Sequence, residues 1–253
     1  LVIGDTIIDE YIHTTPLGKP SKENILACNY NKKEQFLGGI FAAVGNLSSF
    51  SDKVDFVTAV SNTRSEKNFI KKNLPKNINR QFFVNPKKNT TKKTRFLMSA
   101  HSHAKKVFEI YEMNDSPLDK NDENKVIKFC NDNLKNYDLV IVNDYGHGFM
   151  TDKIIKVIEK KSKFLAVNAQ INAGNQGYNL ITKYKKADYV CLDLEEAKRA
   201  IQKKDINHKQ IIDELFSLIE AKYISVTIGS EGSISREKNM KINYNPAFTN
   251  IIV

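Results

Sequence analysis

Tryptophan is absent from the 253 residues, and cysteine, proline and glycine are scarce, with three, six and eleven copies. The cysteines (Cys28, Cys130 and Cys191) are scattered, odd in number and without metal-ligand spacing, which indicates a reducing compartment and buried or idle thiols. No apolar run approaches the length that spans a membrane, and no signal-peptide pattern opens the chain. We therefore expect a cytoplasmic protein without a membrane partner.

The positive charge is large but is not clustered. Lysine and arginine outnumber aspartate and glutamate, which gives a formal net charge of +10. The lysines are spread along the whole chain, and no Arg-rich or aromatic-interleaved patch is present, so we expect no nucleic-acid partner. A phosphate-bearing substrate is the milder inference from this charge.

Alternating strand and helix patterns predict an α/β fold. Continuous apolar runs suited to buried parallel strands alternate with segments of helical periodicity. The predicted strands cover 54–60, 139–143, 164–167, 189–192 and 223–226, and the predicted helices cover 65–73, 120–134, 151–161, 195–201 and 209–219. This order predicts a parallel-sheet three-layer sandwich, with helices on both faces of the sheet. Without an internal repeat or linker, the chain fits one domain.

The first ten residues predict a short buried strand that ends in Gly4-Asp5, with Asp9 four residues later. In open α/β sheets, ligands lie beyond the carboxyl ends of the strands, where we expect Asp5. A dinucleotide-binding fold needs Gly-x-Gly-x-x-Gly at this point, and the chain offers one glycine. That argues against a nicotinamide enzyme.

A glycine pair, Gly38-Gly39, opens a second segment with apolar residues at helical spacing and with Asn46 further along. Glycines let backbone N–H groups come close to a ligand, and the helix behind them adds its positive end. The alternative is a tight turn followed by a packed helix.

The chain resembles the ribokinase-like (PfkB) carbohydrate kinases in its Gly-Asp-x-x-x-Asp segment, its glycine pair and Asn46. Within this family it is most similar to the heptose 7-phosphate kinase branch and its relatives fused to nucleotidyltransferase domains. The resemblance covers most of the chain, with poor matches over 50–92. It implies that the first aspartate and the glycine pair hold sugar hydroxyls. The family usually places an asparagine where this chain has Ala42 and Ala43, so Asn46 alone would serve.

The resemblance also implies a small β lid over the sugar site, formed by residues from about 11–37 and 93–112, which pairs subunits in many members and implies a homodimer. An ordinary β-excursion from the α/β core is the alternative. The implied substrate-binding residues are Asp5, Asp9, Gly38, Gly39, Asn46, Arg95 and Asp144.

Asp144 begins the segment Asp144-Tyr145-Gly146-His147-Gly148, directly after a buried strand. This segment resembles the Asp-Tyr-Gly-x-Gly segment of the heptose kinases, which implies that Asp144 lies near the phosphates or the metal. The alternative is a glycine loop with a solvated aspartate.

The later strand ends resemble the nucleotide side of the family. Asn168 lies at the end of one strand. The spacing Asp193-x-x-Glu196 resembles the family motif Asn-x-x-Glu, which organises Mg²⁺-bound water. The turn that contains Thr227, Gly229 and Gly232 resembles the family's Thr-x-Gly-x-x-Gly turn. The implied cofactors are ATP and Mg²⁺, with Asp193 and Glu196 acting on the metal through water. A helix capping box at Asp193 and Glu196 is a compatible alternative.

In this family a Gly-Ala-Gly-Asp motif holds the catalytic base, and it would follow Val253. We therefore expect that the sequence is an excerpt of a longer protein. We also expect that it contains no catalytic base and is inactive as a fragment. The resemblance implies ATP-dependent phosphorylation of a sugar or sugar phosphate hydroxyl. The alternatives are a nucleoside or other small-alcohol kinase of the same fold, and a non-catalytic sugar-phosphate-binding domain fused to a nucleotidyltransferase.

Overall fold

The computed structural model describes residues 1–84, 87–100, 103–175 and 177–248. Its main sheet is parallel except at one edge, where the last two strands run antiparallel. In order across the sheet, the strands are β12 (Asn243–Asn245), β11 (Ser233–Glu237), β10 (Glu220–Thr227), β9 (Lys186–Asp193), β8 (Leu165–Ala169), β7 (Val140–Asp144), β1 (Val2–Gly18), β3 (Val54–Ala59) and β4 (Ile78–Val84).

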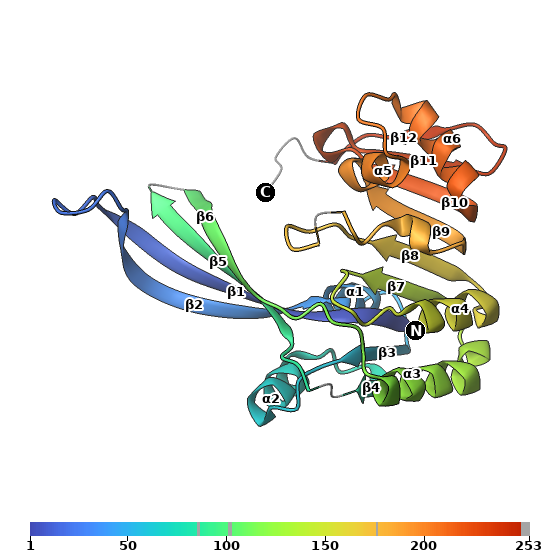
Figure 1. Cartoon of the computed structure of the whole chain (residues 1–253), viewed down its shortest axis with the longest axis horizontal. Helices are drawn as coiled ribbons and strands as arrows, with labels where there is room; N and C mark the ends of the chain where they lie inside the picture. The colour runs from blue at the N-terminus through green and yellow to red at the C-terminus, as the bar shows by residue number, and fades with distance from the viewer. Residues whose placement is uncertain (85–86, 101–102, 176, 249–253) are drawn as a thin grey trace.

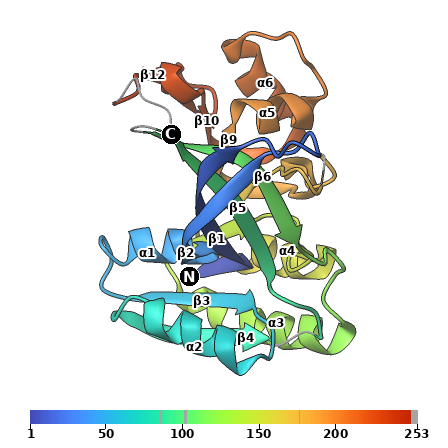
Figure 2. The ribbon, with the colours of Figure 1, turned by 90° about the vertical axis from the view of Figure 1, so that its left-hand side faces the viewer.

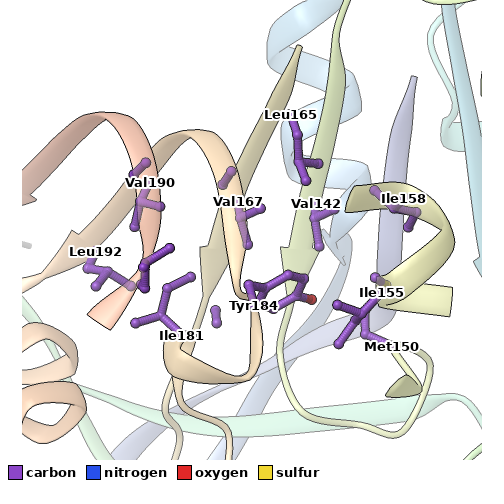
Figure 3. Packing of buried hydrophobic residues seen from close by; sticks show 14 of the residues in the cluster. Val142, Met150, Ile155, Ile158, Leu165, Val167, Ile181, Tyr184, Val190 and Leu192 are labelled. Carbon is purple, nitrogen blue, oxygen red and sulfur yellow. The ribbon is translucent and has the colours of Figure 1, made fainter. Parts of the chain in front are cut away.

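Helices cover the two faces of this sheet (Figure 2). The described α-helices are α1 (Ile40–Leu47), α2 (Arg64–Asn73), α3 (Lys120–Asn133), α4 (Asp152–Lys161), α5 (Leu194–Ile201) and α6 (His208–Leu218), with 3-10 turns at η1 (Leu134–Asn136), η2 (Ile181–Lys183) and η3 (Gly229–Glu231). Because successive side chains of a strand point to opposite faces, Val2 packs in the core beneath α1 and α2, and Ile3 packs in the core beneath the other helices. Figure 3 shows Tyr184 beside Val142 and Ile181 in this second core.

The α/β fold and the parallel sheet predicted from the sequence are confirmed. The helix predicted over 65–73 starts one residue earlier than expected, because α2 begins at Arg64 after an extended Thr63. Among the described residues, no helix is long and apolar enough to cross a membrane.

A four-stranded lid projects from the body as a long arm (Figure 1). Its strands are the outer part of β1, β2 (Ala27–Gly39), β5 (Thr91–Ala100) and β6 (His103–Glu112). The small β lid expected from the sequence is thus present. The expected end of the first strand after Asp5 is wrong, because β1 runs unbroken to Gly18 and exchanges its core neighbours for β2 and β5 as it enters the lid.

Candidate functional site

The polar strand ends lie along one edge of the sheet, as the sequence predicts. Gly4 pairs with Asn143 across β1 and β7, which brings Asp5 beside Asp144. At the other side of the sheet, Thr227 pairs with Asp193 across β10 and β9. The strands β1 and β9 are three places apart, so the edge between them spans roughly 14 Å at the usual strand spacing of about 4.8 Å.

Asp5 is a buried anchor for the loop that follows β7. Its side chain is 3% exposed and accepts backbone N–H groups from Tyr145 at 2.8 Å, His147 at 3.4 Å and Phe149 at 3.2 Å. Burial raises the pKa of Asp5, and the nearby carboxylate of Asp144 adds to this effect. Asp5 therefore lies at the expected edge of the sheet, but the loop after β7 buries its carboxylate.

Asp9 and Arg95 meet on the face of the lid where Gly38 also lies. They form an ion pair, and Arg95 Nε also donates to Glu109 Oε1 at 3.2 Å. A Cβ atom at Gly38 would lie 2.0 Å from Asp9 Oδ2, so any other residue at this position would displace this carboxylate. The structure thus brings together three of the predicted substrate-binding residues. We call Asp9, Gly38, Lys93 and Arg95 the lid cluster.

Lys93 belongs to this lid cluster and was not predicted from the sequence. It is 6% exposed, and its ammonium lies 5.3 Å from the ring centre of Tyr111 and 5.9 Å from that of Tyr145. Burial lowers the pKa of Lys93, whereas the carboxylate of Asp9 opposes this change. Within the described ranges, Lys93 forms no ion pair with a carboxylate. The available signal was its two-residue spacing from Arg95, which places both side chains on one face of a strand.

Gly39 and Asn46 mark the two ends of α1 and have different surroundings. Gly39 has a φ of +60° and an added Cβ would lie 2.3 Å from the carbonyl oxygen of Asp5, so the glycine is needed for close approach. Asn46 lies exposed in the last turn of the helix, about 10 Å along the axis from Gly39. The structure therefore does not bring Asn46 to the lid cluster, and Ala42 and Ala43 occupy the first two turns.

Asp144 is buried, which excludes the solvated aspartate. Tyr184 donates its hydroxyl to Asp144 Oδ2 at 2.6 Å, and Lys183 Nζ lies 2.5 Å from the same oxygen. Burial raises the pKa of Tyr184 well above its ordinary value, with the charge of Asp144 adding to the effect. A cavity of about 330 Å³ opens beside these groups and is also lined by Asp115 and Asn179. Sequence reasoning missed Lys183 and Tyr184, since nothing in their spacing marks them.

Asp193 and Glu196 form a capping box at the start of α5. Asp193 Oδ1 accepts the N–H of Glu196 at 2.7 Å, and Glu196 Oε2 accepts the N–H of Asp193 at 2.9 Å. Glu196 Oε1 also accepts the N–H of Ile171 at 3.2 Å, and burial raises the pKa of Glu196 to about 7. A cavity of about 240 Å³ adjoins both carboxyl groups, with Arg199 on its wall. The cap is thus present, and Asp193 remains exposed beside this cavity.

The remaining predicted nucleotide-side residues hold strand ends in place. Asn168 Nδ2 donates to the carbonyl of Cys191 at 2.9 Å, and Thr227 Oγ1 lies 3.5 Å from the carbonyl of Leu192. Gly229 and Gly232 have φ of +57° and +97° in the tight turn between β10 and β11. An added Cβ at Gly232 would lie 2.0 Å from the carbonyl of Asn245, so this turn needs glycine.

A direct metal centre is not formed by the described side chains. No group of three or more His, Cys, Asp or Glu residues in the described ranges is arranged to hold a metal ion. Binding of Mg²⁺ through water by Asp193 and Glu196, as expected from the sequence, does not require a group of three such residues. Mg²⁺ commonly keeps several waters and takes one or two carboxylates.

Comparisons with known proteins agree with this fold. No family model matches the chain. The chain is 24% identical to the bifunctional protein HldE of Campylobacter jejuni subsp. doylei over 245 residues, 96% of this chain and 50% of that protein. It is 25% identical to the bifunctional protein HldE of Aliarcobacter butzleri over 249 residues, again 96% of this chain and 50% of that protein. The chain therefore spans about half the length of these relatives.

Solved structures of sugar kinases superpose on nearly the whole chain. Phosphofructokinase-2 from Escherichia coli in complex with fructose-6-phosphate has a TM-score of 0.70 at 11% identity, covering 97% of this chain and 79% of that one. Ribokinase of Arabidopsis thaliana complexed with ribose and ATP has a TM-score of 0.61 at 14% identity, covering 98% of this chain and 77% of that one. The chain thus has the ribokinase-like (PfkB) carbohydrate kinase fold and is a distant relative of the HldE proteins.

Proposed function

We propose that the protein transfers the γ-phosphate of ATP to a hydroxyl group of a sugar phosphate, as a heptose phosphate kinase would. The observation that carries the substrate class is the buried ammonium of Lys93, which has no ion-pair partner within the described ranges. An unpaired buried charge is costly, and a phosphate group in the lid cluster would compensate it. A neutral sugar or nucleoside would leave this ammonium with its aromatic contacts and no ion-pair partner.

On the sugar side, the lid cluster offers both kinds of contact that a sugar phosphate needs. The carboxylate of Asp9 accepts hydrogen bonds from sugar hydroxyls, and Gly38 lets the backbone approach the same group. Arg95 and Lys93 supply two positive charges within the same cluster, and guanidinium groups bind phosphate oxygens in pairs. The E. coli phosphofructokinase-2 structure was solved with a sugar phosphate, fructose-6-phosphate, which supports this substrate class.

On the other side, the strand ends at Asn168, Asp193 and Thr227 are proposed to receive the ATP phosphates. The ATP bound to the Arabidopsis ribokinase supports this assignment. Exposed Asp193, with the buried carboxyl group of Glu196 beside it, fits the water-mediated coordination that Mg²⁺ commonly keeps. Mg²⁺, when bound, neutralises charge on the transferring phosphate, and the protein's part is to position the reactants.

A second candidate is a non-catalytic sugar-phosphate-binding domain fused to a nucleotidyltransferase. It is favoured by one observation: Ala42 and Ala43 stand where the family places a sugar-binding asparagine, and Asn46 lies too far along α1 to replace it. The two candidates share the lid cluster and differ in whether ATP is consumed.

Calorimetric titration with sugar phosphates and the matching free sugars tests the proposed substrate class. We expect Lys93→Met to weaken sugar phosphate binding by about 10- to 100-fold, because hydrogen bonds to charged groups contribute about 1.5–3 kcal/mol each. Free sugar binding should change little. Lys92→Met is the matched control, since Lys92 pairs with Glu112 on the opposite face of the strand. Equal affinity of wild type and Lys93→Met for the phosphates would contradict the proposal.

A further inference from the structure

Two opposite charges hold the loop that follows β7. Asp5 accepts three of the loop's N–H groups, as described above. Lys88 Nζ donates to the carbonyl oxygen of His147 in the same loop at 2.8 Å, and Lys88 and Asp5 line one cavity with His147. The same ammonium donates to the carbonyl oxygens of Asn114 at 2.9 Å and Ser116 at 2.6 Å. One lysine therefore satisfies three backbone carbonyls from two separate segments.

These hydrogen bonds join the two connections between the lid hairpin and the body. Lys88 lies in the connection that leads from β4 into β5, whereas Asn114 and Ser116 lie in the connection that leads from β6 to α3. Both connections meet the loop after β7 at a single ammonium group. Nothing in the sequence distinguishes Lys88 from the exposed lysine beside it, Lys87.

The backbone is shaped for this close approach. Gly148 has a φ of +83°, and an added Cβ would lie 2.2 Å from the carbonyl oxygen of Ser116. The ring of His147 adds a contact between the same two segments, because Nδ1 lies 2.8 Å from Asp115 Oδ1. The segments are thus packed at backbone contact distance where Lys88 joins them.

The backbone that presents Lys88 is itself fixed to the body. Thr90 Oγ1 donates to Glu66 Oε2 at 2.6 Å and accepts the N–H of Ser61 at 2.8 Å. Thr91 then begins the pairing of β5 with β1. Lys88 therefore extends from a fixed segment toward two loops that have no strand or helix of their own.

We propose that Asp5 and Lys88 are a positioning pair that fixes the loop over residues 145–149 and so sets the ring of Tyr145 beside Lys93 in the lid cluster. Neither residue needs to touch substrate for this role. Asp5 thereby acquires a function other than the sugar-binding role expected from the sequence. The fixing of the loop is independent of any substrate, whereas its effect on catalysis rests on the proposed function.

Hydrogen exchange on the wild-type protein gives the first test. The N–H groups of Tyr145, His147 and Phe149 lie outside regular secondary structure, and we expect them to exchange as slowly as those of β7. If they exchange as fast as the amides of the turn at 204–206, the positioning pair is refuted. This test needs no variant and no ligand.

The Lys88→Met variant gives the second test. We expect exchange to accelerate at least about tenfold in residues 113–117 and 145–149 while β10 is unchanged, since methionine cannot replace the hydrogen bonds that the charged ammonium donates to both segments. Lys87→Met should leave both segments as in the wild type. Unchanged exchange in both segments would refute the inference, and so would uniform acceleration over the whole chain. If Lys88→Met does not fold, the wild-type measurement and Asp5→Asn decide instead.

Kinetics separate positioning from mere stability. In the full-length protein, we expect Lys88→Met to lower kcat/KM for the sugar phosphate by about 10- to 100-fold, as misplacement of about 1 Å does, with the KM for ATP unchanged. An equal rise in both KM values would contradict the assignment to the lid side. If the wild type binds no sugar phosphate, the proposed function fails, and the exchange results still decide the positioning pair.

Discussion

Replacing Glu196 by glutamine tests the buried cap on the nucleotide side. Glu196 is 5% exposed, and its carboxylate oxygens accept the N–H groups of Asp193 and Ile171. Burial raises its pKa from 4.5 to about 7. Between these values the folded protein keeps a proton that the unfolded chain has released, so the free energy of unfolding falls as the pH rises.

The size of this effect follows from the two pKa values of Glu196. One pKa unit corresponds to about 1.4 kcal/mol, so the change from 4.5 to about 7 lowers the free energy of unfolding by at most about 3 kcal/mol. Glutamine does not titrate, but its NH₂ group cannot accept an N–H, which costs about 1 kcal/mol at every pH. We therefore expect Glu196→Gln to be about 1 kcal/mol less stable than wild type near pH 4 and up to about 2 kcal/mol more stable near pH 8.

Urea denaturation at fixed pH values between 4 and 8 measures this difference. The matched control is Glu195→Gln, because the neighbouring Glu195 side chain is 69% exposed and the variant retains Glu196. The control should follow the pH dependence of the wild type. A difference between wild type and Glu196→Gln that stays constant from pH 4 to pH 8 would refute the reasoning, because it would show that Glu196 does not titrate in this range.

Two further predictions concern the lid. Gly38→Ala should weaken sugar phosphate binding at least tenfold (about 1.4 kcal/mol), because the added methyl group displaces the carboxylate of Asp9. The control is Gly45→Ala, which should bind as the wild type does because a Cβ there meets nothing within 4 Å. Equal loss of affinity in both variants would contradict this prediction. Phe108 and Ile110 are 51% and 49% exposed on the lid, where we expect two subunits to pair. Light scattering should therefore show a dimer for the wild type and a monomer for Phe108→Asp. A monomeric wild type would contradict the expected dimer.

Much of the fold could be predicted because its signals are local. Apolar runs such as 139–143 indicate buried parallel strands whatever their neighbours, whereas the lid was expected from the family resemblance. The continuation of β1 into the lid was missed because it depends on pairing with β2 and β5, which are distant in the sequence. The interval between Asp5 and Asp9 is therefore not a turn after a strand but part of one strand.

The candidate site was predicted only in part, for physical reasons. The burial of Asp5 could not be predicted, because its partners are backbone N–H groups 140 or more residues away. Lys88 and Lys93 were overlooked because 39 lysines and arginines make any one of them inconspicuous, and the loop after β7 that both contact is distant in the sequence. The polar strand ends were found because the carboxyl edge of a parallel sheet follows from strand order alone.

The most direct test of the proposed function is turnover of Mg·ATP by the full-length protein, measured by ³¹P NMR with sugar phosphates and with the matching free sugars. We predict that ADP and a doubly phosphorylated sugar form together, with kcat/KM at least about tenfold higher for the phosphates than for the free sugars, because Lys93 pairs only with an anionic substrate. Equal or faster turnover of free sugars, or no ADP formation with any sugar phosphate, would contradict it.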